Sequence, residues 1–288
     1  MVKDIFGNKW YKLGLHIHTT ISDGRLLPEE SAHVYKEKGF DAIVFTDHWC
    51  YGEEKEIDGL KIFSGCEYNL GAADTIEGVM HIVGVGMEYD PALSKDATRQ
   101  EVIDSIHASG GLAILAHPYW SLNTPEEIMS LKGFDTLEIY NTVSGVNQSF
   151  RAYSGVITDL LANKGYTLPL IATDDTHFYN GEETKSYIMV KCDELTKDSV
   201  ITAIRNKDFY ATQGPELNVI VKNGMITVSC SPCSVIRVIT NSAYCKDRVI
   251  RGENLTEFQY KIKEHERWAR VEVEDKEGNT AWSNIYVQ

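Results

Sequence analysis

The chain has 288 residues, with 28 Lys or Arg against 42 Asp or Glu, so its net charge at pH 7 is −14. This length is enough for two domains and a core that needs no disulfides. An acidic surface repels phosphate backbones and anionic lipids, which disfavours nucleic-acid coating and membrane docking. No apolar run approaches the ~20 residues of a membrane span, and Met1–Trp10 lacks the apolar block of a secretory signal. Six cysteines in a chain of this length do not indicate a disulfide-stabilised fold, so we expect a reducing, cytoplasmic location.

The first part of the chain alternates between short apolar runs and helical patterns. The apolar runs predict strands at Leu13–His18, Ala42–His48, Lys61–Glu67, Met80–Gly86, Leu112–His117, Thr136–Asn141 and Leu168–His177. The helical patterns predict helices at Pro28–Lys38, Asp96–Ala108, Pro125–Leu131, Phe150–Asn163 and Lys197–Asn206. Alternation of this kind predicts a mainly parallel sheet, open or closed.

The pattern changes near Gln213-Gly214-Pro215. Asn223-Gly224 is a strong signal for a β-hairpin. Closely spaced strands without a helical stretch predict a small β-sandwich. We therefore expect two domains, 1–214 and 215–288. The strands predicted for the second domain are Leu217–Lys222, Met225–Cys230, Val235–Thr240, Phe258–Ile262, Trp268–Val273 and Ile285–Val287.

The acidic excess and the histidines belong to the first domain. Residues 1–214 carry 18 basic and 32 acidic side chains, whereas residues 215–288 carry ten of each. Eight of the nine histidines also lie in the first domain, and only His265 does not. A site for several cations needs carboxylates and imidazoles, but an ordinary acidic surface has the same composition, so the positions must decide.

Side chains able to bind metal ions recur where the predicted strands end. Residues two apart in a strand share a face, so His16 and His18 point the same way, as do Asp175 and His177. The carboxyl ends of parallel strands meet at one rim, where barrel enzymes have their active sites. The other residues of this kind close a predicted strand or follow one in a loop, and they are Asp23, His48, Glu67 and His117.

His81 opens its predicted strand instead of closing it. The residues between Glu67 and His81 show no helical period, although a parallel return strand would need a crossover, usually a helix. We therefore expect a hairpin whose antiparallel return strand starts at the rim and brings His81 beside Glu67. The sequence thus predicts six imidazoles and three carboxylates around one metal-binding pocket.

Taken together, these segments resemble the polymerase-and-histidinol-phosphatase (PHP) family of metal-dependent phosphoesterases. The resemblance implies a distorted seven-stranded (β/α) barrel, here followed by the small all-β domain, with two or three divalent ions at its mouth. The matching segments run over about residues 11–180 and are Leu15-His16-Ile17-His18-Thr19, Ser22-Asp23-Gly24, Phe45-Thr46-Asp47-His48, Gly65-Cys66-Glu67, His81-Ile82-Val83-Gly84, Ala116-His117-Pro118 and Asp175-Thr176-His177.

The resemblance also implies which residues hold each ion. The first ion would be held by His16, His18, Glu67 and Asp175. Glu67 would bridge to a second ion held by His81 and His117, and a third would be held by Asp23, His48 and His177. Imidazole and carboxylate ligands accommodate Zn, Mn or Fe, so ligand type does not select the metal.

Five further residues are candidates for the chemistry. Glu138 shares the inner face of its predicted strand with Tyr140, and it can orient a ligand histidine or protonate a leaving group. Many PHP proteins have an Arg shortly after the His-Pro motif, but this chain has Tyr119-Trp120, whose aromatic rings can stack on a substrate ring. Arg25 and Lys185 are candidate phosphate contacts, with solvated surface as the alternative.

Other polar residues have structural alternatives. Asp47 and Asp174 face away from the rim by strand parity, so we expect structural roles for them. Cys230-Ser231-Pro232-Cys233, with Cys245 and His265, has the inventory of a zinc site, but a single CxxC favours free thiols.

The function predicted is that of an enzyme, a metal-dependent phosphoesterase. It would hydrolyse a phosphate ester of a small molecule with a metal-bridged hydroxide, and Glu67, Asp175 and Glu138 would be its catalytic carboxylates. One alternative is an exonuclease or nucleotide phosphodiesterase, against which the charge of −14 counts. Others are a non-catalytic, metal-holding protein that binds a partner and an amidohydrolase, since His-x-His also opens amidohydrolase barrels.

Overall fold

All five predicted helices form in the computed structural model, which describes residues 1–4, 7–76, 78–146 and 150–288. Two of them begin later than expected, α2 at Arg99 and α4 at Gly155. Thr98 and Thr124 cap α2 and α3, because each accepts a hydrogen bond from the backbone of the third helical residue, a glutamate whose side chain bonds back. The helices are α1 (Pro28–Glu37), α2 (Arg99–Ala108), α3 (Pro125–Ser130), α4 (Gly155–Asn163) and α5 (Lys197–Arg205), with a 3₁₀ turn at Val143–Gly145.

The described residues also contain 18 strands, so the protein is of the mixed α/β class. Most of the predicted strands are present, but Tyr187–Lys191, Phe209–Thr212 and Thr280–Trp282 were not predicted. The strands are β1 (Val2–Lys3), β2 (Lys9–Gly14), β3 (Ala42–Val44), β4 (Lys55–Ile57), β5 (Leu60–Phe63), β6 (Gly65–Gly71), β7 (Val79–Val85), β8 (Leu112–Leu115), β9 (Thr136–Asn141), β10 (Leu170–Thr173), β11 (Tyr187–Lys191), β12 (Phe209–Thr212), β13 (Leu217–Lys222), β14 (Met225–Thr240), β15 (Val249–Lys261), β16 (Trp268–Glu274), β17 (Thr280–Trp282) and β18 (Tyr286–Val287).

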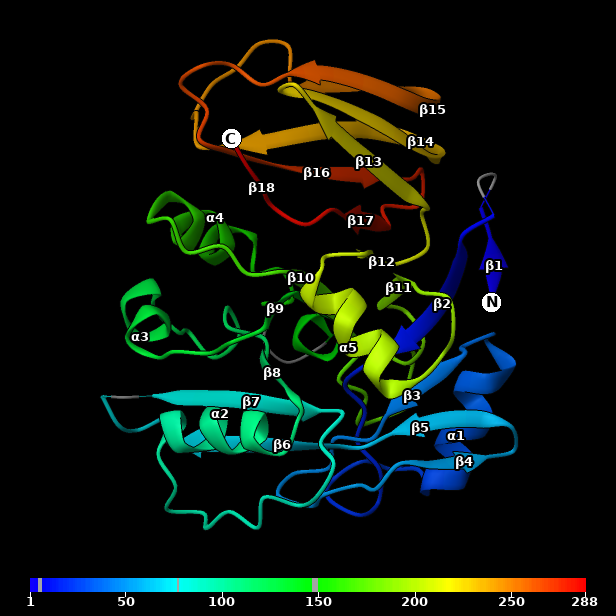
Figure 1. Ribbon diagram of the computed structural model, residues 1–288, viewed down its shortest axis with the longest axis vertical. Helices are drawn as coiled ribbons and strands as arrows, with labels where there is room; N and C mark the ends of the chain where they lie inside the picture. The colour runs from blue at the N-terminus through cyan, green and yellow to red at the C-terminus, as the bar shows by residue number, and fades with distance from the viewer. Residues whose placement is uncertain (5–6, 77, 147–149) are drawn as a thin grey trace.

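The strands form two sheets (Figure 1). A 13-stranded sheet has the path β13-β14-β16-β17-β12-β11-β2-β3-β5-β4, and a five-stranded sheet has the order β10-β9-β8-β7-β6. The pairs β2–β3, β3–β5, β8–β9 and β9–β10 are parallel, as expected. Strand β7 is antiparallel to both β6 and β8, which confirms the predicted hairpin.

The two sheets meet at the rim that the sequence predicted. Parallel bridges join Ile17 to Thr176 and His48 to Glu67. The His18 amide donates to the Thr176 carbonyl at 2.9 Å, which continues the contact beyond the ends of β2 and β10. The α/β class is therefore confirmed, whereas the distorted seven-stranded (β/α) barrel stays a prediction, because isolated bridges rather than ladders join the sheets.

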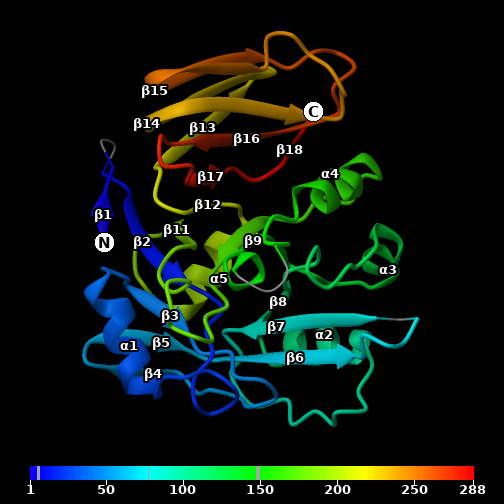
Figure 2. The same cartoon turned by 180° about the vertical axis from the view of Figure 1, so that it is seen from behind.

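Residues 215–288 form the all-β end of the chain, seen at the top of Figures 1 and 2. Asn223 and Gly224 turn between β13 and β14 with positive φ angles of 51° and 70°, as a two-residue hairpin requires. Strand β14 spans two predicted strands, and its pairing with β15 is irregular between Ser229 and Val235. Since β17 pairs with β12, the large sheet runs across the predicted domain boundary, and the division at residue 214 stays a prediction.

Three apolar cores stabilise these layers. The largest core contains residues of both sheets, and it includes Trp268, Trp282 and Ile285 from the all-β end. A second core lies within the all-β end around Ile236 and Val271, and a third lies beneath α1. No helix in the described part of the chain is long and apolar enough to cross a bilayer.

Candidate metal centre

All nine predicted ligand side chains lie together where the two sheets meet. Their nitrogen and oxygen atoms form three overlapping groups, and within each group the atoms lie no more than 4.8 Å apart. The inner group is His16, His18, Glu67 and Asp175, the second is Glu67, His81 and His117, and the outer group is His18, Asp23, His48 and His177.

In the inner group, two imidazoles face two carboxylates across one central point. His16 Nε2 lies 3.2 Å from Glu67 Oε2 and 3.1 Å from Asp175 Oδ1. His18 Nε2 lies 3.0 Å and 3.2 Å from the same two oxygens. All four atoms are buried, and none has a hydrogen-bond partner among the described residues.

These orphaned atoms fit a divalent cation. A tetrahedral Zn ion holds its ligands at about 2.0–2.1 Å, which places the ligand atoms about 3.3 Å from one another. Buried polar atoms without a partner are costly, and a cation at the centre of the group would satisfy all four together. The residues present therefore suit the metal that the motifs predicted.

Glu67 also faces the second group. Its Oε2 points to the inner group, while its Oε1 lies 2.8 Å from His81 Nδ1 and 3.4 Å from His117 Nε2. The β6–β7 hairpin explains the contact between Glu67 and His81. It pairs His81 with Asn69, and Glu67 lies two residues from Asn69 on the same face of β6. One carboxylate thus offers an oxygen to each of two ligand groups.

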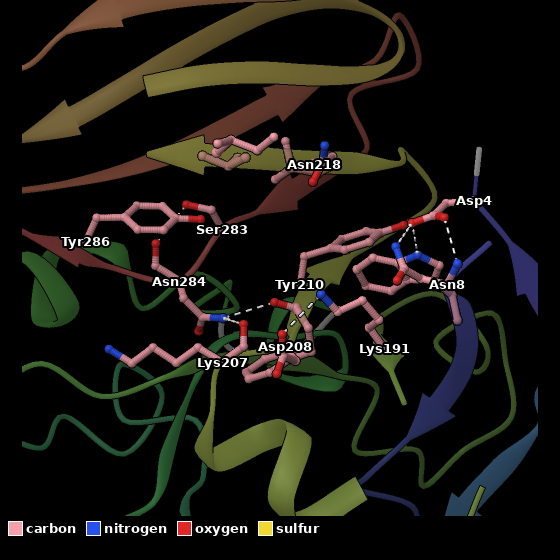
Figure 3. Close-up of a pocket in the computed structure, with 15 residues that line it drawn as sticks. Asp4, Asn8, Lys191, Lys207, Asp208, Tyr210, Asn218, Ser283, Asn284 and Tyr286 are labelled. Carbon is pink, nitrogen blue, oxygen red and sulfur yellow. Dashed lines mark hydrogen bonds and ion pairs between the residues drawn. The ribbon is translucent and has the colours of Figure 1, made fainter. Parts of the chain in front are cut away.

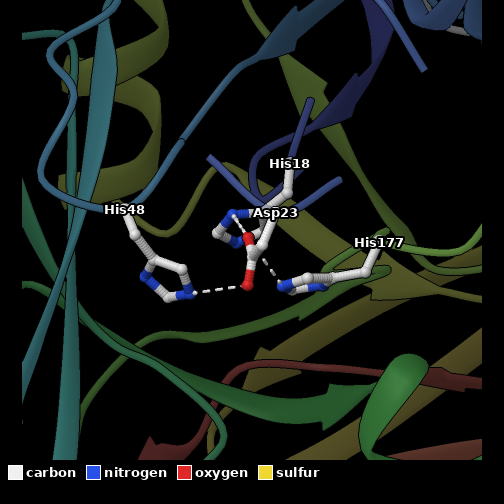
Figure 4. A group of neighbouring side chains, drawn as sticks. All are labelled: His18, Asp23, His48 and His177. Atoms are coloured by element: carbon white, nitrogen blue, oxygen red, sulfur yellow. Dashed lines mark ion pairs between the residues drawn. The ribbon is translucent and has the colours of Figure 1, made fainter. Parts of the chain in front are cut away.

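The outer group surrounds Asp23 (Figure 4). The Asp23 carboxylate lies 3.5 Å from His18 Nδ1 and from His177 Nε2, and 3.8 Å from His48 Nε2. Its side chain is 54% exposed, so this group is the most open of the three. Figure 4 shows the three rings converging on this carboxylate from separate segments of the chain.

The loop that carries Asp23 is held against the rim. The Asp47 carboxylate accepts hydrogen bonds from the Thr19 amide at 2.8 Å and the Ser22 amide at 3.1 Å, which is the structural role expected for it. A Cβ on Gly24 would lie 2.5 Å from the His18 carbonyl, so only glycine lets the loop fold back here.

The carboxylates and imidazoles strongly shift each other's pKa. Burial alone would raise the pKa of Glu67 and Asp175, but the neighbouring imidazoles outweigh it and lower both. Burial alone would lower the pKa of His18, but Asp175 and Glu67 raise it to about 9. Burial prevails at His48 and lowers its pKa to about 4. The pocket keeps its carboxylates ionised and is suited to positive charge.

Two ligand residues have an unusual backbone conformation. His117 has a φ of 27° and Asp175 a φ of 53°, although residues with a Cβ rarely adopt positive φ. Such conformations persist where the surrounding structure enforces them, and they cluster at functional sites. They turn each side chain toward the rim at the end of its strand.

Glu138 lies behind the ligands and orients two of them. Its Oε1 lies 2.8 Å from His16 Nδ1, and its Oε2 accepts a hydrogen bond from the His117 amide at 2.8 Å. Thr173 Oγ1 and Asn141 Nδ2 also donate to it. Because Glu138 is fully buried and its oxygens are engaged, the geometry favours the orienting role over protonation of a leaving group. Asn141, which also donates to Asp175 Oδ2 at 3.1 Å, was not singled out from the sequence.

The three residues predicted to contact the substrate, Tyr119, Arg25 and Lys185, have different surroundings. Tyr119 is 40% exposed, but Trp120 rather than Tyr119 packs on the ligand rings, 4.9 Å from His117 and 5.7 Å from His81 between centroids. The Arg25 amide donates to the His177 carbonyl, and its guanidinium lies over Phe178. Lys185 is exposed, and its amide donates to Asp174.

Asp174 has the structural position that parity predicted. Its carboxylate accepts hydrogen bonds from Tyr35 Oη and from the Lys185 and Ser186 amides, so it ties α1 and the start of β11 to the end of β10. Burial raises its pKa to about 7.

The cysteines are all free thiols. Cys230 and Cys233 lie 3.6 Å apart between sulfur atoms, but neither they nor Cys245 and His265 belong to a potential metal group among the described residues.

A hollow of about 320 Å³ lies away from the metal-binding rim, between β2, β12 and the all-β end (Figure 3). Its charged side chains are largely paired, as Figure 3 shows for Asp4 with Asn8, and Lys191 lies 3.2 Å from Asp208. None of the nine ligand residues lines it.

Comparison with known proteins gives one relative in sequence. No family model matches the chain. An uncharacterized protein of Methanocaldococcus jannaschii, MJ1587, is 32% identical over 120 residues, which cover 38% of this chain and 68% of the archaeal protein. The chain belongs to the family of that protein.

Comparison with solved structures extends to the whole chain. A two-domain protein of Bacteroides vulgatus superposes with a TM-score of 0.56 and 15% identity, over 100% of this chain and 97% of its own. That protein is described as containing a predicted PHP-like metal-dependent phosphoesterase. The chain has a PHP-like fold. The resemblance predicted from the motifs is thereby confirmed at the level of the fold.

A second solved structure has a lower similarity. PsfC from Pseudomonas syringae is 13% identical with a TM-score of 0.48, over 68% of this chain and 90% of its own.

Proposed function

We propose that this PHP-like chain is a metal-dependent phosphoesterase that hydrolyses a phosphate ester of a small molecule. The observation that carries the proposal is the division of Glu67 between two ligand groups, with Oε2 in the inner group and Oε1 beside His81 and His117. A carboxylate in this position suits a pair of cations. In phosphoester hydrolysis, a cation pair acts on the attacking and the leaving oxygen.

The residues divide the work of the site. Bound divalent ions would acidify a coordinated water and neutralise charge on the phosphoryl oxygens. Glu67 and Asp175 would hold the ions as carboxylates, because their pKa is lowered. Glu138 would hold the His16 ring and the His117 backbone in position through its two hydrogen bonds. Two or three ions of Zn, Mn or Fe suit the nitrogen and oxygen ligands.

The surrounding architecture supports the same proposal. We propose that residues 1–214 act as the catalytic unit, in which the two sheets work as one distorted seven-stranded barrel, and that residues 215–288 form a separate β-sandwich unit. The bridges at Ile17/Thr176 and His48/Glu67 support the proposal that the two sheets work as one barrel. The separate apolar core around Ile236 supports the proposal of a β-sandwich unit.

The test removes one imidazole or one carboxylate from the inner group. His16→Ala and Asp175→Ala should each abolish metal-dependent phosphate release and lower the bound metal measured by elemental analysis. The matched control is His33→Ala, because His33 is exposed on α1 and, within the described part of the chain, pairs only with Glu37 across one helical turn. Unchanged turnover in either inner-group variant would contradict the proposal, as would absence of phosphate release from every ester with Zn, Mn and Fe.

A further inference from the structure

A hollow of about 580 Å³ opens beside the second ligand group. Three segments of the rim line it, namely the turn of the β6–β7 hairpin, the loop after β8 and the segment that precedes α4. The Asn123 side chain ties the first two together, since its Nδ2 donates to the Val79 carbonyl at 2.7 Å. Two of these three parts of the chain also carry predicted ligands, because Glu67 and His81 lie on the hairpin and His117 lies in the loop after β8.

The hollow shares a wall with the ligands. Trp120 lines it, and the same indole packs edge-on against the rings of His117 and His81. Ser121 also lines it, and its hydroxyl lies 3.1 Å from His117 Nδ1. A molecule whose phosphate lies at the ligands can therefore extend its remainder into the hollow.

The hollow exposes large apolar side chains. Ile76 is fully exposed, Leu122 is 59% exposed and Trp120 is 36% exposed. Covering such surface is favourable by about 25 cal/mol per Å². An indole side chain beside two aliphatic side chains suits a flat apolar group, because aromatic rings pack favourably against one another.

Arg151 supplies a positive charge to the same hollow. Among the described residues, no carboxylate forms an ion pair with its guanidinium, whereas the other charged residue of the wall, Glu127, is engaged. Glu127 Oε2 accepts from the Thr124 amide at 2.8 Å, and Oε1 faces Arg99 at 3.8 Å. Arg151 is therefore free to bind an anionic group, and a guanidinium pairs with a carboxylate through two hydrogen bonds.

We propose that this hollow binds the leaving group of the substrate, and that the leaving group is an aromatic alcohol carrying an acidic substituent. The inference rests on the proposed phosphoesterase function and adds the substrate class to it. In the reaction, the oxygen of water forms a new bond to phosphorus, the bond from phosphorus to the alcohol oxygen breaks, and the alcohol leaves with a proton. Trp120, Ile76 and Leu122 contact the ring, and Arg151 pairs with its acidic group.

The experiment compares three phosphate monoesters whose alcohols have similar acidity, so that leaving-group chemistry stays constant. They are methyl phosphate, benzyl phosphate and 4-carboxybenzyl phosphate, and phosphate release is measured with the metal-loaded full chain. We expect kcat/KM to rise roughly tenfold or more with the ring and again with the carboxylate. A nucleoside monophosphate is included, and faster turnover of it than of 4-carboxybenzyl phosphate would overturn the assignment.

Variants test each part of the wall. Arg151→Gln should remove the preference for 4-carboxybenzyl over benzyl phosphate, by lowering kcat/KM for the carboxylated ester. Arg151→Glu should instead prefer 4-(aminomethyl)benzyl phosphate over 4-carboxybenzyl phosphate. A purely structural role of Arg151 would not produce this reversal. Leu122→Asn with Ile76→Thr should reduce the preference for benzyl over methyl phosphate, because Trp120 alone then contacts the ring, and Asn suits the positive φ of 58° at residue 122. The control is Arg251→Gln, an exposed arginine on β15 that should change none of these ratios.

The outcomes separate the two proposals. Equal turnover of the three esters, or ratios that no Arg151 variant changes, would overturn the leaving-group assignment while the phosphoesterase function stands. If the unmodified, metal-loaded protein released phosphate from none of the esters, the proposed function would be contradicted. Calorimetric binding of 4-(hydroxymethyl)benzoate, weakened roughly tenfold or more in Arg151→Gln, would support the hollow independently of turnover.

Discussion

The hydrogen bonds around residue 138 require a carboxylate and not merely a polar side chain. Four donors surround it, two at each oxygen, and they include the imidazole of His16 and the backbone of His117. Only a group with two acceptor oxygens satisfies all four. Sequence parity placed Glu138 on the inner face, but only the tertiary structure shows that it contacts His16 and the His117 amide.

Glu138→Gln should therefore weaken metal binding about 10–100-fold, in the range found when partners of ligand histidines are lost. The amide nitrogen would face two donors at one of the oxygen positions. Metal titration monitored by elemental analysis measures the effect. Glu126→Gln is the control, because Glu126 is exposed and pairs with Lys164 at 3.0 Å. Equal affinity in the two variants would show that Glu138 does not position the ligands.

Cys245 should be the most reactive thiol of the chain toward alkylation. Burial would raise its pKa, but the hydrogen bond with Lys263 Nζ at 2.8 Å outweighs burial and lowers it. In contrast, burial raises the pKa of Cys66 and Cys230 to about 12. The thiolate is the reacting form, so alkylation of Cys245 should rise with pH and reach half its maximal rate below the ordinary thiol pKa.

Iodoacetamide labelling followed by peptide mass spectrometry checks this order. Lys263→Met should slow the labelling of Cys245 near pH 7, because the thiol loses its cationic partner. Labelling of Cys66 or Cys230 ahead of Cys245 would contradict the prediction.

At the scale of elements, β16 and β17 join the all-β end to the rest of the molecule, β17 by pairing with β12 and β16 by the contacts of Arg270. Arg270 of this strand is 1% exposed, and its Nε lies 2.8 Å from Asp159 of α4. It also contacts Tyr153 and pairs with Glu272. Trp282 of β17 stacks on Tyr140 of β9, two residues from Glu138, so the all-β end packs directly behind the metal-binding rim.

Arg270→Met should lower the free energy of unfolding by about 3 kcal/mol, because removing one partner of a buried ion pair leaves the other uncompensated. The figure lies at the low end of the range, since Arg237 still faces Glu272 at 3.2 Å. Denaturant unfolding of the full chain measures the change. The double variant Arg270→Met with Glu272→Leu should recover part of the loss, and a loss as large in the double variant as in the single one would contradict the ion-pair explanation.

At the scale of the whole molecule, metal binding and folding should be coupled. The ligands come from segments between residues 16 and 177, so an unfolded chain does not present them together. A ligand that binds only the folded state adds about 2.7 kcal/mol of stability at 100 times its Kd.

Chelation should therefore lower Tm by several degrees, and added Zn or Mn should restore it. Scanning calorimetry over a metal titration measures the shift, and the Tm of Asp175→Ala should respond less, because this variant lacks a residue of the inner group. A Tm that is independent of metal in the unmodified protein would show that the site does not hold a cation.

Local pattern alone carried the prediction of the rim. Strand parity placed His16 with His18 and Asp175 with His177, and the absence of a helical period after Glu67 indicated the hairpin that brings His81 back. Residue type and period 2 act over a few neighbouring positions, so they are readable in a single sequence. The nine side chains brought together by the fold are those that these local signals marked.

Only the tertiary structure decided how distant segments pack. It placed Trp120 rather than Tyr119 against the ligand rings, grouped Arg151 with Ile76 and Leu122 around one hollow, and continued the large sheet from β12 into β17. These contacts join loops and strand edges far apart along the chain, whose relative positions depend on the whole core. No local period encodes them, because packing between distant elements leaves no repeat in the sequence.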